Sequence, residues 1–406
     1  MVATVSKFFK SHPTIKKQPY RDTYSVGNTS VNRYVGEFWT AKQRQSSSIH
    51  EVSYRACFKA ELPNFFIQWL TKPGDVVYDP FSGRCTTVLE AALSGRKIIA
   101  NDINPLSRII GEARLHIPDL DLLKHRLDSI KINKRLKSNI DLSMFYHKDT
   151  LVEILSLRSY LLNRLKEKKI DNLDRWIQMV ATNRLTGHSK GFFSVYTLPP
   201  NQATSPQSQI RINNKLNQKP EYRNVCDIIL KKSKSLIRTL SKDQIKTLKR
   251  VSSSAKFLNC DAQSTGAIKN NSVNLTITSP HFLDTIDYYG DNWLRCWFNG
   301  FDAKAVANSI RISRNADEWK KMMGNVFKEL YRITNPGGWV AFEVGEIRNK
   351  TIKMEDLVIP IGVDAGFHCE ALLINKQRFT KTANIWGVKN NKDGTNSNRI
   401  ILFYKR

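Results

Sequence analysis

Two adjacent stretches decide the fold: Val76-Val77-Tyr78-Asp79-Pro80-Phe81-Ser82-Gly83-Arg84-Cys85-Thr86-Thr87 and, after an apolar segment, Ile98-Ile99-Ala100-Asn101-Asp102-Ile103-Asn104-Pro105. The apolar run that ends at Asp79 predicts a strand, and Gly83 predicts a turn in which the backbone can approach a ligand. Helical spacing over residues 86–94 predicts a helix, and residues 98–100 predict a short buried strand. Asp102 follows about 20 residues after the turn, where a nucleoside-binding α/β fold places a carboxylate for the ribose hydroxyls. The same pattern also fits any strand–helix–strand unit of a parallel sheet.

The charge balance of the 406-residue chain is strongly basic. There are 64 Lys and Arg against 36 Asp and Glu, which gives a net charge of +28. Self-repulsion of this size favours a polyanionic partner, with nucleic acid as the first candidate and a membrane surface as the second. No apolar run is long enough for a membrane-spanning helix, and the first residues do not resemble a secretory signal. We therefore expect a cytoplasmic, nucleoid-associated protein with no membrane partner.

The six cysteines are scattered, and no two of them form a C-x-x-C pair. This usage is typical of reduced thiols in a cytosol and argues against a zinc site or a disulfide framework. We expect no metal.

Composition divides the chain into four parts. Residues 1–48 predict a basic N-terminal arm or, equally, a disordered tail. Residues 49–118 predict the cofactor-binding half of a catalytic domain, residues 119–254 a basic insertion of helices and loops, and residues 255–406 the catalytic half. Within the last part, strand patterns recur at residues 255–261, 272–278, 339–344, 369–373 and 399–404, and the final two predict a strand pair that closes the sheet.

The insertion carries most of the excess charge. Residues 121–256 contain 28 Lys and Arg but only 11 Asp and Glu. Residues 187–223 within it are rich in Asn, Gln, Ser and Pro, and long irregular stretches of this kind are usually either functional or disordered. A charged surface is often merely solvated, but a surplus this one-sided favours a surface that faces nucleic acid.

Four features fall at the ends of predicted strands. They are the turn at residues 79–83, Asp102, Asp261 and the tetrapeptide Ser279-Pro280-His281-Phe282. Ligands of open α/β sheets bind outside the carboxyl ends of the strands, so these features are expected to meet in one crevice. Together they predict a nucleoside pocket with a reactive corner.

The segment DPFSGRCTTVLEAALSGRKIIANDINP, residues 79–105, resembles the first two motifs of the DNA amino-methyltransferases, which methylate cytosine N4 or adenine N6. The tetrapeptide resembles their catalytic S/D/N-P-P-Y/F motif. The likeness covers roughly residues 50–118 and 255–375. It implies an α/β fold with a Rossmann-like, doubly wound, seven-strand methyltransferase sheet, in which the basic and mainly helical insertion is the target-recognition region.

The resemblance also implies S-adenosylmethionine as the methyl donor. Asp102 would bind the ribose hydroxyls, and Asp261 would bind the adenine amino group. The methionine part would be held by Asp79, Phe81 and Gly83, and Phe58 would pack on the cofactor. A carboxylate accepts two hydroxyl donors well, and a sulfonium cation is favoured beside acidic and aromatic groups.

The tetrapeptide suits an exocyclic amine, whose lone pair is delocalised into the ring. The Ser279 hydroxyl and the Pro280 carbonyl would accept hydrogen bonds from the amine and free its lone pair for direct attack on the methyl group. Phe282 would stack on a base turned out of the duplex. Ser in the first position is typical of cytosine-N4 enzymes, so we lean to cytosine N4.

Three alternatives stay open: an adenine-N6 DNA enzyme, an RNA amino-methyltransferase acting on guanine N2, and a nucleic-acid-binding relative with impaired catalysis. The last is suggested by Cys85 and His281, which stand where the family has glycine and proline. C5-cytosine chemistry is excluded because no cysteine follows a proline.

Target recognition is assigned to polar and aromatic residues of the insertion, since Arg, Asn and Gln can read base edges while Lys mainly contacts phosphate. The candidates for DNA binding are Arg184, His188, Lys190, Tyr196, Asn201 and Gln202. Asp291, Asn292 and Trp293 follow the tetrapeptide closely enough to line the base pocket. The expected partners are double-stranded DNA and a cognate restriction nuclease.

Overall fold

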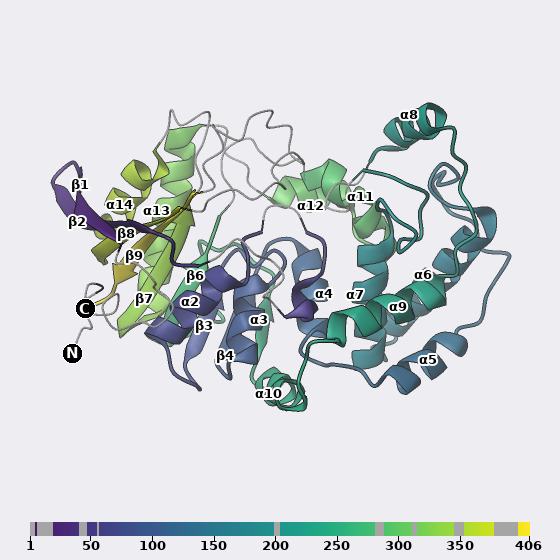
Figure 1. Ribbon diagram of the computed structural model, residues 1–406, viewed down its shortest axis with the longest axis horizontal. Helices are drawn as coiled ribbons and strands as arrows, with labels where there is room; N and C mark the ends of the chain where they lie inside the picture. The colour runs from purple at the N-terminus through teal and green to yellow at the C-terminus, as the bar shows by residue number, and fades with distance from the viewer. Residues whose placement is uncertain are drawn as a thin grey trace.

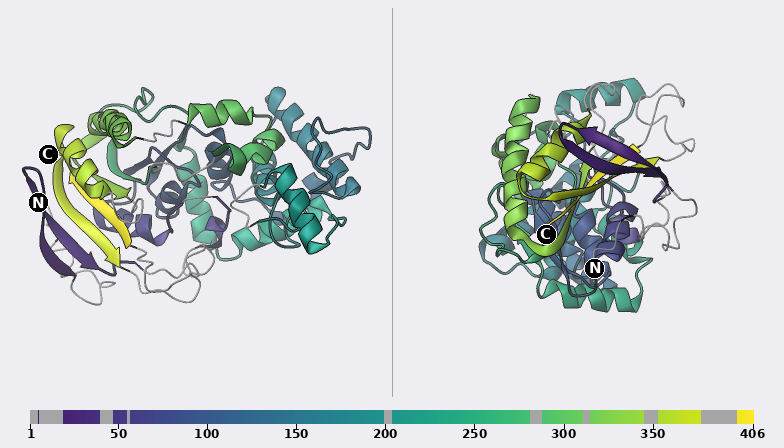
Figure 2. Two further views of the ribbon diagram at one scale, coloured as in Figure 1. Left: turned by 90° about the horizontal axis from the view of Figure 1, so that it is seen from above. Right: turned by 90° about the vertical axis from the view of Figure 1, so that its left-hand side faces the viewer.

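The structure is a computed structural model, which describes residues 5, 19–39, 47–54, 57–198, 204–280, 288–310, 315–344, 353–376 and 397–406 (Figure 1). A mixed sheet with helices on both faces forms one half of the molecule, and a helical insertion forms the other half (Figure 2). No helix of the described segments is both long and apolar enough to cross a membrane.

The sheet has the strand order β1-β2-β8-β9-β7-β6-β3-β4-β5. Its strands are β1 (Tyr20–Val26), β2 (Thr29–Gly36), β3 (Val76–Asp79), β4 (Lys97–Asn101), β5 (Lys256–Leu258), β6 (Val273–Thr278), β7 (Thr334–Val344), β8 (His368–Lys376) and β9 (Ser397–Tyr404). Strands β5, β4, β3, β6 and β7 are parallel neighbours. Strand β9 runs antiparallel to both β7 and β8, which confirms the predicted strand pair at the end of the chain.

The predicted count of seven strands is too low by two in the described residues. Residues 20–36, assigned from the sequence to an N-terminal arm, form the hairpin β1–β2. This hairpin extends the sheet because residues 32–36 pair in parallel with residues 371–375 of β8. Val31 and Tyr34 are buried against the rest of the sheet, whereas the polar residues between them hide the strand pattern in the sequence.

Alternating side chains of the central strands supply two separate cores. Val77 packs with helices α2 (Glu61–Leu70), α3 (Thr86–Leu93) and α4 (Pro105–Ala113) on one face. Tyr78 packs with α13 (Ala316–Ile333) and α14 (Met354–Asp364) on the other. Since β3 is buried on both faces, all of its residues from Val77 to Asp79 are buried, as expected for a central parallel strand.

The insertion is mainly helical. Its helices are α5 (Leu120–Asp128), α6 (Lys148–Lys166), α7 (Asn172–Arg184), α8 (Pro206–Leu216), α9 (Val225–Ile237) and α10 (Lys242–Ser252), and α11 (Tyr288–Asn299) and α12 (Ala303–Ser309) follow β6. Asp174 is fully buried in it and binds Arg126 and Arg164 at 2.6 and 2.5 Å. In Figure 1, α7 links the sheet to the outer helices and has α4 on one side and α11 on the other.

Candidate active site

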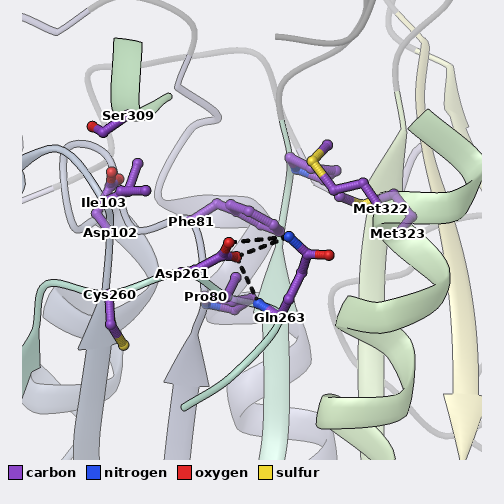
Figure 3. Close-up of a pocket in the computed structure, with 12 residues that line it drawn as sticks. Pro80, Phe81, Asp102, Ile103, Cys260, Asp261, Gln263, Ser309, Met322 and Met323 are labelled. Atoms are coloured by element: carbon purple, nitrogen blue, oxygen red, sulfur yellow. Dashed lines mark hydrogen bonds between the residues drawn. The ribbon is translucent and has the colours of Figure 1, made fainter. Parts of the chain in front are cut away.

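One pocket lies at the carboxyl ends of β3, β4, β5 and β6 (Figure 3). Its volume, including solvent at its open mouth, is about 490 Å³. Four of the segments singled out in the sequence contribute to its wall, through Phe81, Asp102, Asp261 and Pro280. The remaining lining residues are Pro80, Ile103, Cys260, Ala262, Gln263, Ser309, Met322 and Met323. The geometry is that of a ligand crevice in an open α/β sheet.

The turn after β3 is fixed to Asp102. Gly83 has a φ of +47°, and its N–H donates to Asp102 Oδ2 at 2.7 Å. The other carboxylate oxygen accepts the N–H of Asn104 at 2.9 Å. Burial raises the pKa of Asp102 to about 6, and these two backbone donors counteract the shift. The carboxylate is therefore held in one orientation and retains lone pairs for further donors.

Tyr54 covers the same turn and was not singled out in the sequence. A Cβ atom placed on Gly83 would lie 3.3 Å from the Tyr54 ring, and the Tyr54 hydroxyl accepts a hydrogen bond from Asn104 Nδ2 at 3.2 Å. Burial raises the pKa of Tyr54 well above its ordinary value. Residue 83 has a left-handed backbone conformation and a close aromatic neighbour, so both its φ angle and the space around it favour glycine.

Asp79 lies beneath the turn instead of in the pocket wall. It is 1% exposed, and its Oδ1 accepts hydrogen bonds from the Phe81 N–H at 3.1 Å and from Thr278 Oγ1 at 2.7 Å. Burial raises its pKa to about 7. Asp79 thus joins the turn after β3 to the end of β6, and its direct contact with a cofactor stays a prediction.

Asn101, at the end of β4, ties the loops on either side of it together. Its Nδ2 donates to the Pro80 carbonyl at 3.3 Å and to the Cys260 carbonyl at 3.0 Å, and its Oδ1 accepts the Cys260 N–H at 3.2 Å. One signal for this role of Asn101 is visible in the sequence: a polar residue directly follows the apolar run of residues 98–100. Asn101 sets the spacing between the pocket loops that bear Phe81 and Asp261.

Asp261 faces the pocket and binds an amide donor. The Nε2 atom of Gln263 lies 3.2 and 3.0 Å from its two carboxylate oxygens, as the dashed lines in Figure 3 show. The Gln263 N–H donates to Asp261 Oδ1 at 2.9 Å, and Gln263 Oε1 accepts from Asn325 at 2.9 Å. The Asp261 carboxylate is therefore already hydrogen-bonded to the planar –NH₂ group of Gln263.

Cys85 points away from this pocket. It has a left-handed φ of 60°, is 1% exposed, and places its Sγ 3.5 Å from the carbonyl and hydroxyl oxygens of Ser107 on α4. Burial raises the pKa of the thiol to about 12. Cys85 is therefore a packed thiol, and its left-handed backbone is a conformation that glycine, the residue of the related motifs, adopts more readily.

The remaining cofactor and catalytic candidates lie as follows. Ser279 is half-buried at the end of β6, and Pro280 is buried in the pocket wall. Phe58 is half-buried, contacts the core beside α2, and accepts a hydrogen bond from Arg84 through its carbonyl at 3.2 Å, but it does not line the pocket. His281 and Phe282 lie outside the described residues.

The predicted DNA-binding residues differ in exposure. Arg184 is only 8% exposed, with its guanidinium 3.9 Å from the centre of the Phe192 ring, and burial lowers its pKa to about 10. The side chain therefore packs against the loop from within, and its contact with DNA stays a prediction. His188 and Lys190 are exposed, and Tyr196 is 42% exposed. Asn201 and Gln202 lie outside the described residues.

The loop that bears His188 and Lys190 is held from below by Arg223. Its guanidinium donates to the carbonyls of Ser189 at 3.1 Å, Phe192 at 2.9 Å and Ser194. Three carbonyls on one guanidinium fix the backbone while the loop's polar side chains stay at the surface. Sequence reasoning missed Arg223, which is separated from the loop by α8.

The base-pocket candidates lie at the start of α11. Asp291 and Asn292 are each 6% exposed, and Trp293 is half-buried with its ring 6.1 Å from that of Phe145. Within the described chain, Asn292 Oδ1 and Trp293 Nε1 have no hydrogen-bond partner. Contact of these residues with a base stays a prediction.

Comparison with known proteins identifies relatives of part of the chain. Residues 4–109 match the family model described as DNA methylase. The chain is 27% identical over 137 residues to the type II methyltransferase M.MjaII of Methanocaldococcus jannaschii, covering 32% of this chain and 26% of the relative. It is 45% identical over 53 residues to the type II methyltransferase M.PvuII of Proteus hauseri, covering 13% and 16%.

These alignments span about a quarter or less of each curated relative. Among solved structures, the rRNA methyltransferase aviRa from Streptomyces viridochromogenes aligns over 90% of this chain and 93% of its own, at 10% identity and a TM-score of 0.35. The DNA methylase model and the two type II methyltransferases confirm the resemblance of this chain to the DNA amino-methyltransferases.

Proposed function

We propose that this protein transfers a methyl group from S-adenosylmethionine to an exocyclic amine of a base in double-stranded DNA. The observation that carries the proposal is that Phe81, Asp102 and Asp261 line the same pocket as Pro280 of the tetrapeptide. The first three are the expected cofactor contacts, and the fourth belongs to the expected catalytic motif. Their meeting is what a direct transfer between two bound reactants requires.

The residues of the pocket fit the cofactor. Asp102, oriented by two backbone N–H groups, would accept the ribose hydroxyls. Asp261 would accept the adenine amino group in place of the Gln263 amide, which is a donor of the same shape. Phe81, Met322 and Met323 supply an apolar and polarisable wall for the remaining part of the cofactor. S-adenosylmethionine, when bound, supplies an electrophilic methyl group on a sulfonium.

Ser279 and Pro280 would act on the target amine. The Ser279 hydroxyl and the Pro280 carbonyl can each accept a hydrogen bond from the amine, which withdraws the nitrogen lone pair from the ring and makes the nitrogen nucleophilic. Such acceptors cannot reach a base inside the duplex, so the base would be turned out of the stack. The serine in the first position of the tetrapeptide favours cytosine N4 over adenine N6.

The basic insertion would bind the DNA. Its excess of Lys and Arg provides the sequence-independent attraction, and the loop held by Arg223 presents His188, Lys190 and Tyr196 at its surface. A type II modification enzyme acts beside a restriction nuclease of the same specificity, so such a nuclease is the proposed partner. A basic DNA-modifying protein is also expected to associate with the nucleoid.

Product analysis tests the proposal. The purified protein is incubated with methyl-labelled S-adenosylmethionine and with duplex DNA or RNA, and the nucleosides are then identified by mass. Labelled N4-methylcytosine in DNA is the expected product. Labelled N6-methyladenine would support the proposed methylation of a DNA amine but would identify adenine as the target base. Labelled guanine in RNA, or cofactor binding without any methylated nucleoside, would overturn the proposal.

A further inference from the structure

A buried acid stands next to the first residue of the tetrapeptide. Glu343, on β7, is 8% exposed. Parallel pairing places Thr278 opposite Phe342, so the next residues, Ser279 and Glu343, lie side by side where β6 and β7 reach the pocket end of the sheet. The Ser279 hydroxyl lies within hydrogen-bonding reach of the Glu343 carboxyl group and acts to lower its pKa.

The second neighbour of the acid comes from β9. The Nδ2 atom of Asn398 donates to Glu343 Oε1. The charged residue next to it, Arg399, forms an ion pair with Glu355 of α14, on the helix that covers the opposite face of the sheet. Within the described chain, no charged group is among the causes that move the pKa of Glu343. The acid is thus contacted by two neutral side chains, of which Ser279 belongs to the proposed reaction centre.

We infer that Glu343 is the final proton acceptor of methyl transfer and acts through the Ser279 hydroxyl. The inference rests on the proposed function. Methylation forms a nitrogen–carbon bond and breaks the sulfur–carbon bond of the donor, whose electron pair stays on sulfur. The nitrogen is left with one proton too many. That proton moves to the Ser279 oxygen as the Ser279 proton moves to the Glu343 carboxylate, which later releases it to water.

The properties of Glu343 suit this role. Burial raises its pKa to about 7, while the hydrogen bonds of Asn398 and Ser279 oppose the shift, so the group can take up and release a proton near neutral pH. Asp79 and Asp102 are already engaged by donors of the turn after β3. Glu343 does not itself need to touch the base, since it orients the Ser279 hydroxyl and accepts its proton.

Glu343→Gln provides the test, because glutamine keeps the shape and the hydrogen bond to Ser279 but cannot accept a proton. We expect kcat for methyl transfer to fall about 100-fold at pH 8, with KM for DNA and cofactor affinity within about twofold of the wild type. Wild-type kcat should rise with pH through about 7 and then level off, and the variant should lose this part of the rise. Asp79 titrates in the same range, so the difference between the two profiles is the readout.

Glu355→Gln is the matched control, since it also removes a buried carboxylate but on the opposite face. It should lower thermal stability and leave the pH profile of kcat unchanged. A Glu343→Gln variant with wild-type kcat and pH profile would overturn the inference while leaving the proposed function intact. If the Glu343→Gln variant does not fold, the pH profile of the wild type provides the test. A wild-type kcat that stays constant across the pH range around 7 would also overturn the inference. A wild type that binds cofactor but methylates no nucleic acid would overturn the proposed function, and this role with it.

Discussion

The N–H of Gly83 donates a 2.7 Å hydrogen bond to the carboxylate of Asp102, joining the turn after β3 to the end of β4. One glycine and one acid, 19 residues apart, are therefore joined directly, and the acid lines the pocket. The turn presents a backbone donor that fixes the orientation of the acid, and we propose that the acid binds a ribose from this position.

Replacing Asp102 with Asn should weaken cofactor binding. The change removes the charge that would accept the ribose hydroxyls in the proposed complex, and a hydrogen bond to a charged group contributes about 1.5–3 kcal/mol, so the Kd should rise about 10- to 100-fold. Titration calorimetry with S-adenosylmethionine measures the change. Asp317→Asn, at an exposed position on α13, is the control, and an unchanged Kd for Asp102→Asn would rule out its ribose role.

Gly83→Ala should destabilise the turn and reduce cofactor affinity. A φ of +47° is unfavourable for alanine, and the new Cβ would lie 3.3 Å from the Tyr54 ring. We expect a loss of about 1–3 kcal/mol in the free energy of unfolding, measured by denaturant titration. Gly27→Ala is the matched control, because Gly27 has a similar φ of +53° but no atom within 4 Å of the added Cβ. Equal losses of cofactor affinity in both variants would contradict the specific role of Gly83.

Cys85→Gly should leave cofactor affinity within about twofold of the wild type. The Cys85 side chain contacts Ser107 and does not line the pocket, so its removal opens no space for the ligand. Relief of the left-handed strain and loss of a buried thiol act in opposite directions on stability. A tenfold gain in affinity by calorimetry would show instead that Cys85 restricts the site.

The buried Asp79 carboxyl should make the stability of the cofactor-free protein depend on pH. Its pKa is raised from 3.8 to about 7, so the protonated group stabilises the folded state below 3.8, and this contribution is lost as pH rises through about 7. Asp79→Asn cannot ionise, so the wild type should lose stability relative to it by up to about 1.4 kcal/mol per pH unit in that window. Denaturant titrations at several pH values measure the difference, and parallel pH curves would show that Asp79 does not titrate there.

Much of the pocket could be predicted from the sequence because its parts are local. An apolar strand, a glycine turn and an acid at the next strand end are short-range patterns, and the parallel sheet brings their ends together. Tyr54, Asn101 and Arg223 were missed because each acts through contacts with residues distant in the chain. The hairpin at residues 20–36 was missed for a related reason: its pairing with β8 joins segments more than 300 residues apart.

The exposure of Arg184 could not be read from the sequence either. A basic residue beside a polar loop suggests a surface contact, but stacking on Phe192 and the neighbouring helices remove it from solvent. Arginine can be buried in this way because its planar guanidinium packs on aromatic faces.

The most direct test of the central claim is the rate of methyl transfer from labelled S-adenosylmethionine to duplex DNA, measured for the wild type and for Ser279→Ala. Our account predicts a labelled exocyclic amine with the wild type. It predicts a rate about 100-fold lower for the variant, at unchanged cofactor affinity, because the hydroxyl that accepts the amine proton is gone. A Ser279→Ala variant that methylates DNA at the wild-type rate would contradict it.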